Sequence, residues 1–205
     1  MDDQLPLLHL ELTVVSEKFP LFTTVFQSGI EIMTPAGSSL GQFLGGLPGF
    51  TAEYLADTVQ TIFHNGKAVD DLTALLSGER PVVALSAAMP GLAGAIFRRN
   101  SFHAALRSEI RDNQLQTQAT KPLTVTLKLF NSIALERGKD LLRDGVRLPA
   151  EVLAGFLANR PALQEAIRLV RRDGQVIDRA ALPQFLAQPT LLHLQIFDTM
   201  ANANG

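Results

Sequence analysis

The chain has 205 residues, of which 46% are hydrophobic and 19% are charged, so it can bury a core and is not a disordered tail. It contains no cysteine, which excludes disulfides, thiolate metal sites and cysteine nucleophiles. Four scattered histidines, no tryptophan and a net charge of −2 indicate neither a histidine-rich metal site nor a stacking platform for nucleic acid.

The start of the chain predicts no export. The sequence MDDQLPLLHLEL is acidic, whereas a secretory signal begins with basic residues. The longest uncharged run that could enter a membrane covers residues 81–97, and it is interrupted by Pro90, Gly91 and Gly94. Because a membrane-spanning helix needs about 20 apolar residues, we interpret this run as a buried strand followed by an apolar turn. We expect a cytoplasmic protein without a membrane partner.

An internal repeat organises the sequence. Residues 8–15 and 123–130 both alternate apolar and polar side chains, which is typical of a half-buried strand. Downstream of each, a glycine opens a second short strand, at Gly29 and at Gly145. These matched positions indicate two copies of one structural unit.

The later parts of each copy also match. The helical stretches LGQFL at 40–44 and LAGFL at 153–157 place leucine and phenylalanine on one face. Third strands begin at Val59 and Ile167 and run into tight turns.

The two tight turns are Asn65-Gly66 and Asp173-Gly174. These pairs favour two-residue hairpins, because both central positions of such a turn need positive φ. Apolar strands at 82–88 and 191–197 close the two copies. This order of elements predicts an α+β fold with one mixed sheet and one packed helix in each copy.

The two copies are separated by a segment of different composition. We predict a first unit at 1–90, a bridge at 91–122 and a second unit at 123–205. The bridge carries Phe102 and Leu106 near helical spacing and then becomes polar, so we expect it to be partly helical and partly a linker.

The pattern resembles the β-grasp, or ubiquitin-like, fold, and within it the sulfur-carrier branch that includes the molybdopterin synthase small subunit and the thiamine sulfur carrier. The residues that carry the resemblance are Pro35-Ala36-Gly37, Pro149-Ala150, His64–Asp71 and 172–178. In addition, LKLFNSIALERGKD at 127–140 resembles the opening strand and loop of the molybdopterin subunit. The resemblance implies two tandem β-grasp units and covers both copies but not the bridge.

The family's chemistry depends on a flexible C-terminal Gly-Gly, whose carboxylate becomes a thiocarboxylate. This chain departs from that pattern, because it ends MANANG, with Gly205 preceded by Asn204. The only Gly-Gly, Gly45-Gly46, is expected to end the first helix. A carrier would have to use Gly205 without a glycine neighbour, or a new terminus exposed by cleavage after Gly94.

Charge is distributed unevenly along the chain. Residues 1–90 contain 10 acids and 3 bases, a balance of −7, whereas residues 91–205 contain 10 acids and 15 bases, a balance of +5. Most of these bases are arginines, which suit bidentate pairing with carboxylates at interfaces. The predicted partner-binding residues lie in the bridge: Arg98, Arg99, His103, Arg107 and Arg111. We expect a protein partner or a homo-oligomer, and the interspersed acids disfavour nucleic acid.

No catalytic pattern is present in the sequence. Asp70 and Asp71 are consecutive and would point in opposite directions on an extended segment. His64 is expected to be exposed beside its turn and to hydrogen-bond within the hairpin, and His193 is expected on the polar face of its strand. The chain also lacks a G-x-S-x-G elbow and a phosphate-binding loop. We therefore predict no enzyme, no catalytic or metal residues and no cofactor.

Three functions follow from these observations. The leading hypothesis is a non-catalytic protein-interaction module of tandem ubiquitin-like domains. The second is a sulfur-carrier-like protein linked to the biosynthesis of molybdenum or tungsten cofactor or of thiamine. The third is binding of an anionic small molecule between the two units.

Overall fold

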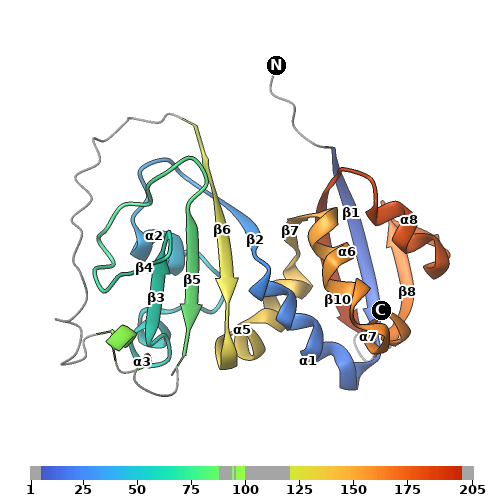
Figure 1. Cartoon of the computed structure of the whole chain (residues 1–205), viewed down its shortest axis with the longest axis horizontal. Helices are drawn as coiled ribbons and strands as arrows, with labels where there is room; N and C mark the ends of the chain where they lie inside the picture. The colour runs from blue at the N-terminus through green and yellow to red at the C-terminus, as the bar shows by residue number, and fades with distance from the viewer. Residues whose placement is uncertain (1–5, 88–93, 95, 100–120, 200–205) are drawn as a thin grey trace. The chain divides into compact units, whose positions relative to one another are not determined.

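A computed structural model of the chain describes residues 6–87, 94, 96–99 and 121–199 (Figure 1). Contacts within the chain group it into two compact units. Unit 1 combines residues 1–30 with residues 138–205, and unit 2 consists of residues 31–137. Each unit is α+β, as the sequence predicts.

The sheet of unit 1 contains strands from both ends of the chain. Its strands are β1 (Leu7–Val14), β7 (Val146–Pro149), β8 (Ile167–Arg172), β9 (Gln175–Ile177) and β10 (Leu191–Asp198). Their spatial order is β7-β10-β1-β8-β9. The sheet is mixed, because β1 runs parallel to β10 while the other neighbouring pairs are antiparallel.

Helices bury one face of this sheet. The helices of unit 1 are α1 (Phe19–Phe22), α6 (Ala150–Ala158), α7 (Pro161–Ala166) and α8 (Leu182–Leu186). Helix α6 packs beside β7, and α1 packs beside β10 (Figure 1). The rings of Phe22 and Phe156 meet with centroids 6.3 Å apart. Their burial beside Leu192 and Leu194 forms the core of the unit.

Unit 2 contains five strands with mixed pairing. Its strands are β2 (Ile30–Thr34), β3 (Thr61–His64), β4 (Lys67–Ala68), β5 (Val82–Ser86) and β6 (Leu123–Leu129). Their order is β4-β3-β5-β6-β2, and β5 runs parallel to β6. Helices α2 (Leu40–Gly45) and α3 (Ala52–Asp57) belong to this unit. Helix α5 (Asn131–Asp144) contains the boundary, which falls between Arg137 and Gly138.

Both predicted hairpin turns are confirmed. Asn65 and Gly66 have φ values of 50° and 79°, and Asp173 and Gly174 have φ values of 48° and 80°. Positive φ at both central positions is the geometry that matches the twist of the flanking strands. The prediction that Gly45-Gly46 ends the first helix is also confirmed, because α2 ends at Gly45 and Gly46 is its C-cap.

The sequence repeat and the compact units divide the chain differently. Strand β1 comes from the first sequence copy but lies in unit 1 with the strands of the second copy. Strand β6 comes from the second copy but lies in unit 2 beside β5 of the first. In each unit, one of the two parallel strands therefore comes from the other sequence copy.

Two expectations about local structure are wrong. Each unit has more than the one helix predicted, because short turns of helix at α1, α3, α7 and α8 carry apolar residues that the sheets alone would leave exposed. The segment 127–140 is not a strand and loop beyond Leu129, since residues from Asn131 onward form α5.

Candidate functional site

The face of the unit 1 sheet opposite the core is polar and accessible. Along β1, Leu10 and Leu12 are buried while His9 is exposed and Glu11 is half-buried. Along β10, Leu192, Leu194 and Ile196 are buried, and the alternating residues between them are half-buried. This is the period of two expected for a strand with one face in the core, and it confirms the predicted placement of His193.

Strand register arranges this face in rows. His193 lies directly opposite Arg147 on β7 and opposite His9 on β1. We call Arg147, His193 and His9 the basic row. The next row along the strands contains Gln195, Glu11 and Arg171, since Glu11 pairs with both of the others. Side chains of one row are cross-strand neighbours and interact directly.

The two histidines of the basic row touch. Their ring centroids are 4.9 Å apart, and the ring planes are inclined by 52°. Burial, together with the charges of His9 and Arg147, lowers the pKa of the His193 imidazole below its ordinary value of 6.5. At neutral pH the His193 ring is consequently uncharged. Protonation of this ring at lower pH is opposed by the charges of His9 and Arg147.

Gly145 fixes the position of the His193 ring. It has a φ of 102°, and a Cβ atom at this residue would overlap Cε1 and Nε2 of His193. The Nδ1 atom of His193 is buried and has no hydrogen-bond partner among the described residues. The ring is thus held by packing against backbone rather than by hydrogen bonds.

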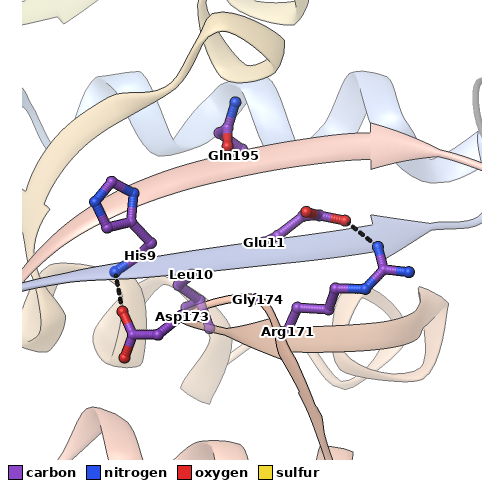
Figure 2. A pocket seen from close by; sticks show the side chains of 7 residues that line it. All are labelled: His9, Leu10, Glu11, Arg171, Asp173, Gly174 and Gln195. Atoms are coloured by element: carbon purple, nitrogen blue, oxygen red, sulfur yellow. Dashed lines mark hydrogen bonds and ion pairs between the residues drawn. The ribbon is translucent and has the colours of Figure 1, made fainter.

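A hollow of about 420 Å³ lies beside the basic row (Figure 2). It is lined by His9, Leu10, Glu11, Arg171, Asp173, Gly174 and Gln195. Figure 2 shows Glu11 joined to Arg171, with their atoms Oε1 and Nη1 2.6 Å apart. It also shows the backbone N–H of His9 donating to Oδ1 of Asp173 over 3.1 Å.

The ionisable groups around this hollow are engaged in contacts that hold strands and a turn together. The Asp173 carboxylate accepts from the backbone of His9 and not from its imidazole, so the pair is not arranged as an acid-base dyad. The Glu11 carboxylate is satisfied by Arg171. Large apolar side chains border the polar rows, since Leu7 is 44% exposed and Val176 is 63% exposed. Such a mixture of apolar and polar groups suits recognition of another molecule.

A second hollow in unit 1 is more apolar, with a volume of about 430 Å³. It lies among α6, α7 and α8. Its polar side chains bind the backbone: Nε2 of Gln164 donates to the carbonyl of Leu157 over 2.8 Å, and Nη1 of Arg179 donates to that of Ile167 over 3.1 Å. Because these groups already support the fold, we place the candidate site on the sheet face.

Two of the predicted partner-binding residues are described. Arg98 and Arg99 line a hollow of about 300 Å³ in unit 2. Nη1 of Arg99 donates to the carbonyl of Leu55 over 2.9 Å, and its backbone N–H donates to Gln60 over 2.7 Å. Arg99 therefore ties its segment to the end of α3, whereas Arg98 is exposed. The other predicted residues, His103, Arg107, Arg111 and the tail candidate Gly205, lie outside the described residues.

The expectation for His64 is wrong in part. Its side chain is 9% exposed and buried rather than solvent-facing. Its Nε2 atom lies 3.4 Å from the backbone N–H of Ser77 and 3.3 Å from Nδ2 of Asn65. The contact with Asn65 is the hydrogen bond predicted within the hairpin, but the segment around Ser77 covers the ring.

Asp71 has the structural role expected of a turn residue. Its Oδ1 atom accepts hydrogen bonds from the backbone N–H of Thr73 over 2.8 Å and from its hydroxyl over 2.7 Å. These two bonds, the hydroxyl first, lower the pKa of the Asp71 carboxyl. The carboxylate stabilises a local turn.

Within residues 6–87, 94, 96–99 and 121–199, no group of three or more histidine, aspartate or glutamate side chains could hold a metal ion. No helix of that same part of the chain is both long and apolar enough to cross a membrane.

Sequence reasoning missed the histidine pair. The sequence places His9 and His193 in different predicted units, because each lies in its own copy of the repeat. The available signal was their shared position on alternating strands, with leucines on both sides of each. Comparisons with protein-family models, with curated proteins and with solved structures gave no match to this chain.

Proposed function

We propose that this protein is a non-catalytic interaction module of two ubiquitin-like units, and that a protein partner binds the polar sheet face of unit 1. The observation that carries the proposal is the accessible hollow lined by His9 and Arg171, together with two exposed aliphatic side chains on the same strand face. Leu7 lies two residues before His9 on β1, and Val176 lies opposite Arg171 on β9. Exposed aliphatic side chains beside polar groups with fixed positions are typical of interaction surfaces.

The bonding of the ionisable groups supports binding over catalysis. Glu11 and Arg171 neutralise each other, and Asp173 holds the backbone of His9. Each of these charged groups stabilises a particular strand or turn. Recognition needs such fixed groups, whereas a general acid or base needs an ionisable group aimed at a reacting atom.

The β-grasp likeness remains part of the proposal. It is supported by the mixed strand pairing and packed helices within each unit and by the two hairpin turns at matched positions of the repeat. The exchange of β1 and β6 between the sequence copies is a feature that tandem, separately folded units would not have. We therefore propose two units that are ubiquitin-like in architecture and interlaced in chain connectivity.

Site-specific photo-crosslinking in the native host tests the proposal. A photoreactive amino acid would replace Leu7 or Val176, with Glu151, an exposed residue of α6, as the matched control. We expect positions 7 and 176 to form adducts with the same protein and position 151 to form none. Absence of adducts from both sheet positions, or equal adducts from position 151, would contradict the proposal. An adduct of doubled chain mass would identify the partner as a second copy.

A further inference from the structure

The open face of unit 1 has an apolar row directly beside its basic row. Leu7 pairs in register with Leu191, and Leu191 pairs with Pro149 on β7. Leu7 is exposed, and Leu191 and Pro149 are half-buried on the same face. Two residues away on each of these three strands lie His9, His193 and Arg147. A ligand lying across these strands would therefore meet aliphatic side chains beside imidazole and guanidinium groups.

The carboxylates nearest the basic row are held by other groups. Glu11 is 2.6 Å from Arg171, and Oδ2 of Asp173 is 3.6 Å from Nε of Arg172 while its Oδ1 accepts the backbone N–H of His9. Among the described residues, the exposed imidazole of His9 contacts the His193 ring, and Asp173 reaches only the backbone N–H of His9. A bound anion could approach this imidazole without displacing an existing ion pair.

Among the charged groups on the elements packed around the two imidazoles, arginines outnumber carboxylates. These charged groups are Arg147 on β7, Glu11 on β1, Arg171 and Arg172 on β8, Asp173 in the turn, and Arg143 on α5. Arg143 is itself bridged to Asp198 over 3.2 Å. Protonation of His193 would add positive charge, and the carboxylates of this set already pair with arginines or the backbone.

We infer that the partner segment recognised by this face is an acidic peptide in which carboxylates flank an aliphatic side chain. The aliphatic side chain would pack on Leu7 and Leu191, and the carboxylates would accept hydrogen bonds from His9 and the basic row. This inference rests on the proposed interaction function and names the chemistry of the partner. Charge complementarity of this kind fixes register and excludes basic partners.

Titration of the full chain with a synthetic peptide tests the inference. The probe is an octapeptide of alternating glutamate and leucine, compared with its glutamine-leucine counterpart and with inorganic phosphate. The histidine Cε1 resonances, assigned with single histidine-to-glutamine variants, are followed by NMR near pH 6. We expect the glutamate peptide to shift the resonances of His9 and His193. The His64 resonance in unit 2 should stay unchanged.

Substitutions give the second readout. His9→Gln and Arg147→Gln should each weaken binding of the glutamate peptide by about two- to five-fold, as expected for loss of one exposed ionic contact. Arg168→Gln, which removes an exposed arginine of β8 outside the basic row, should leave the affinity unchanged. Equal weakening by all three substitutions would contradict the inference, because it would indicate attraction by net charge alone.

The outcomes separate this inference from the proposed function. If photo-crosslinks form at Leu7 and Val176 but the glutamate peptide does not bind, the surface is an interface and the acidic partner is wrong. If the glutamine peptide binds equally well, the recognition is apolar and the acidic partner is again wrong. If phosphate alone reproduces the shifts and no crosslinks form, the face is a small-anion site and both proposals are wrong.

Discussion

His9 and His193 come from opposite ends of the chain and face each other in register on the parallel strands β1 and β10. Their rings lie 4.9 Å apart on the open face of unit 1. The contact joins the first strand of the sequence to the last. A measurement that detects this ring contact therefore also detects the pairing of β1 with β10.

The stability of unit 1 should fall on acidification because of His193. Its pKa is lowered in the folded chain, whereas in the unfolded chain it returns to about 6.5. The unfolded state then binds more protons below that pH, so stability is lost as pH falls through the unfolded value toward the folded one. Urea midpoints at about pH 7.5 and pH 5.5 should differ more in the wild type than in His193→Gln. Equal differences would contradict the assignment. His9→Gln, which removes one of the repelling charges, should lie between the two.

Gly145 should tolerate no side chain. A Cβ atom would overlap the His193 ring, and a φ of 102° is costly for any L residue. Gly145→Ala should destabilise the protein by on the order of 3 kcal/mol, combining backbone strain with overpacking. Chemical denaturation measures the loss. The matched control is Gly155→Ala in α6, where a Cβ would meet nothing within 4 Å. That change should be neutral or stabilise by up to about 1 kcal/mol, and a comparable loss in both variants would contradict the argument.

Short-range patterns in the sequence predict much of the local structure. Alternation at 8–15 and 191–197 predicts β1 and β10, and each predicted end lies within one residue of the observed end. The Asn65-Gly66 and Asp173-Gly174 turns follow from their need for positive φ. These features depend on neighbouring residues, so sequence periodicity is sufficient to find them.

Helix α5 shows where local patterns fail. Gly138 lies in its middle and weakens the helical signal of the surrounding residues. The structure explains this glycine, because a Cβ atom there would lie 2.8 Å from Cβ of Thr23 and 3.0 Å from Cε2 of Phe26. Close packing against residues far away in sequence selects glycine, and no pattern within 127–140 reveals it.

The candidate site was missed for a related reason. The sequence directs attention to the arginines of the bridge, whereas the described site depends on strand neighbours that belong to different copies of the repeat. His9 meets His193 only because β1 lies beside β10. Strand pairing across such a separation is set by the whole fold and not by either strand.

Tyr54 provides a spectroscopic test of unit 2, since it is the only tyrosine and the chain has no tryptophan. Burial, followed by its hydrogen bond to Glu136, raises the pKa of the Tyr54 phenol to about 12. Nearby, the guanidinium of Arg137 lies 4.0 Å from the ring centroid. Absorbance titration should show tyrosinate only near pH 12 while circular dichroism shows folded protein. Glu136→Gln should lower this pKa, and Arg137→Gln should raise it. Ionisation near the ordinary value of 10.0 in the folded protein would contradict the contact.

The interlaced units predict that neither half of the sequence folds alone. A chain of residues 1–115 contains β1 and α1 of unit 1 but lacks residues 138–205 of that unit, and it lacks β6 of unit 2. A chain of residues 116–205 has the converse deficit. Each should therefore be unfolded or aggregated when expressed separately, because each sheet would lose one of its two parallel central strands.

Co-refolding of the two fragments should restore both units. We expect a one-to-one complex with the circular dichroism spectrum of the intact chain, since β1 from one fragment enters the sheet of β8 and β10 while β6 from the other pairs with β5. Leu12→Asp in the first fragment should abolish the unit 1 signals, because Leu12 is fully buried between those strands. A fragment that folds as a soluble monomer would contradict the interlaced connectivity. It would indicate instead that each sequence copy folds independently. Formation of the complex would show that the covalent link at residue 115 is dispensable and that strand exchange holds the halves together.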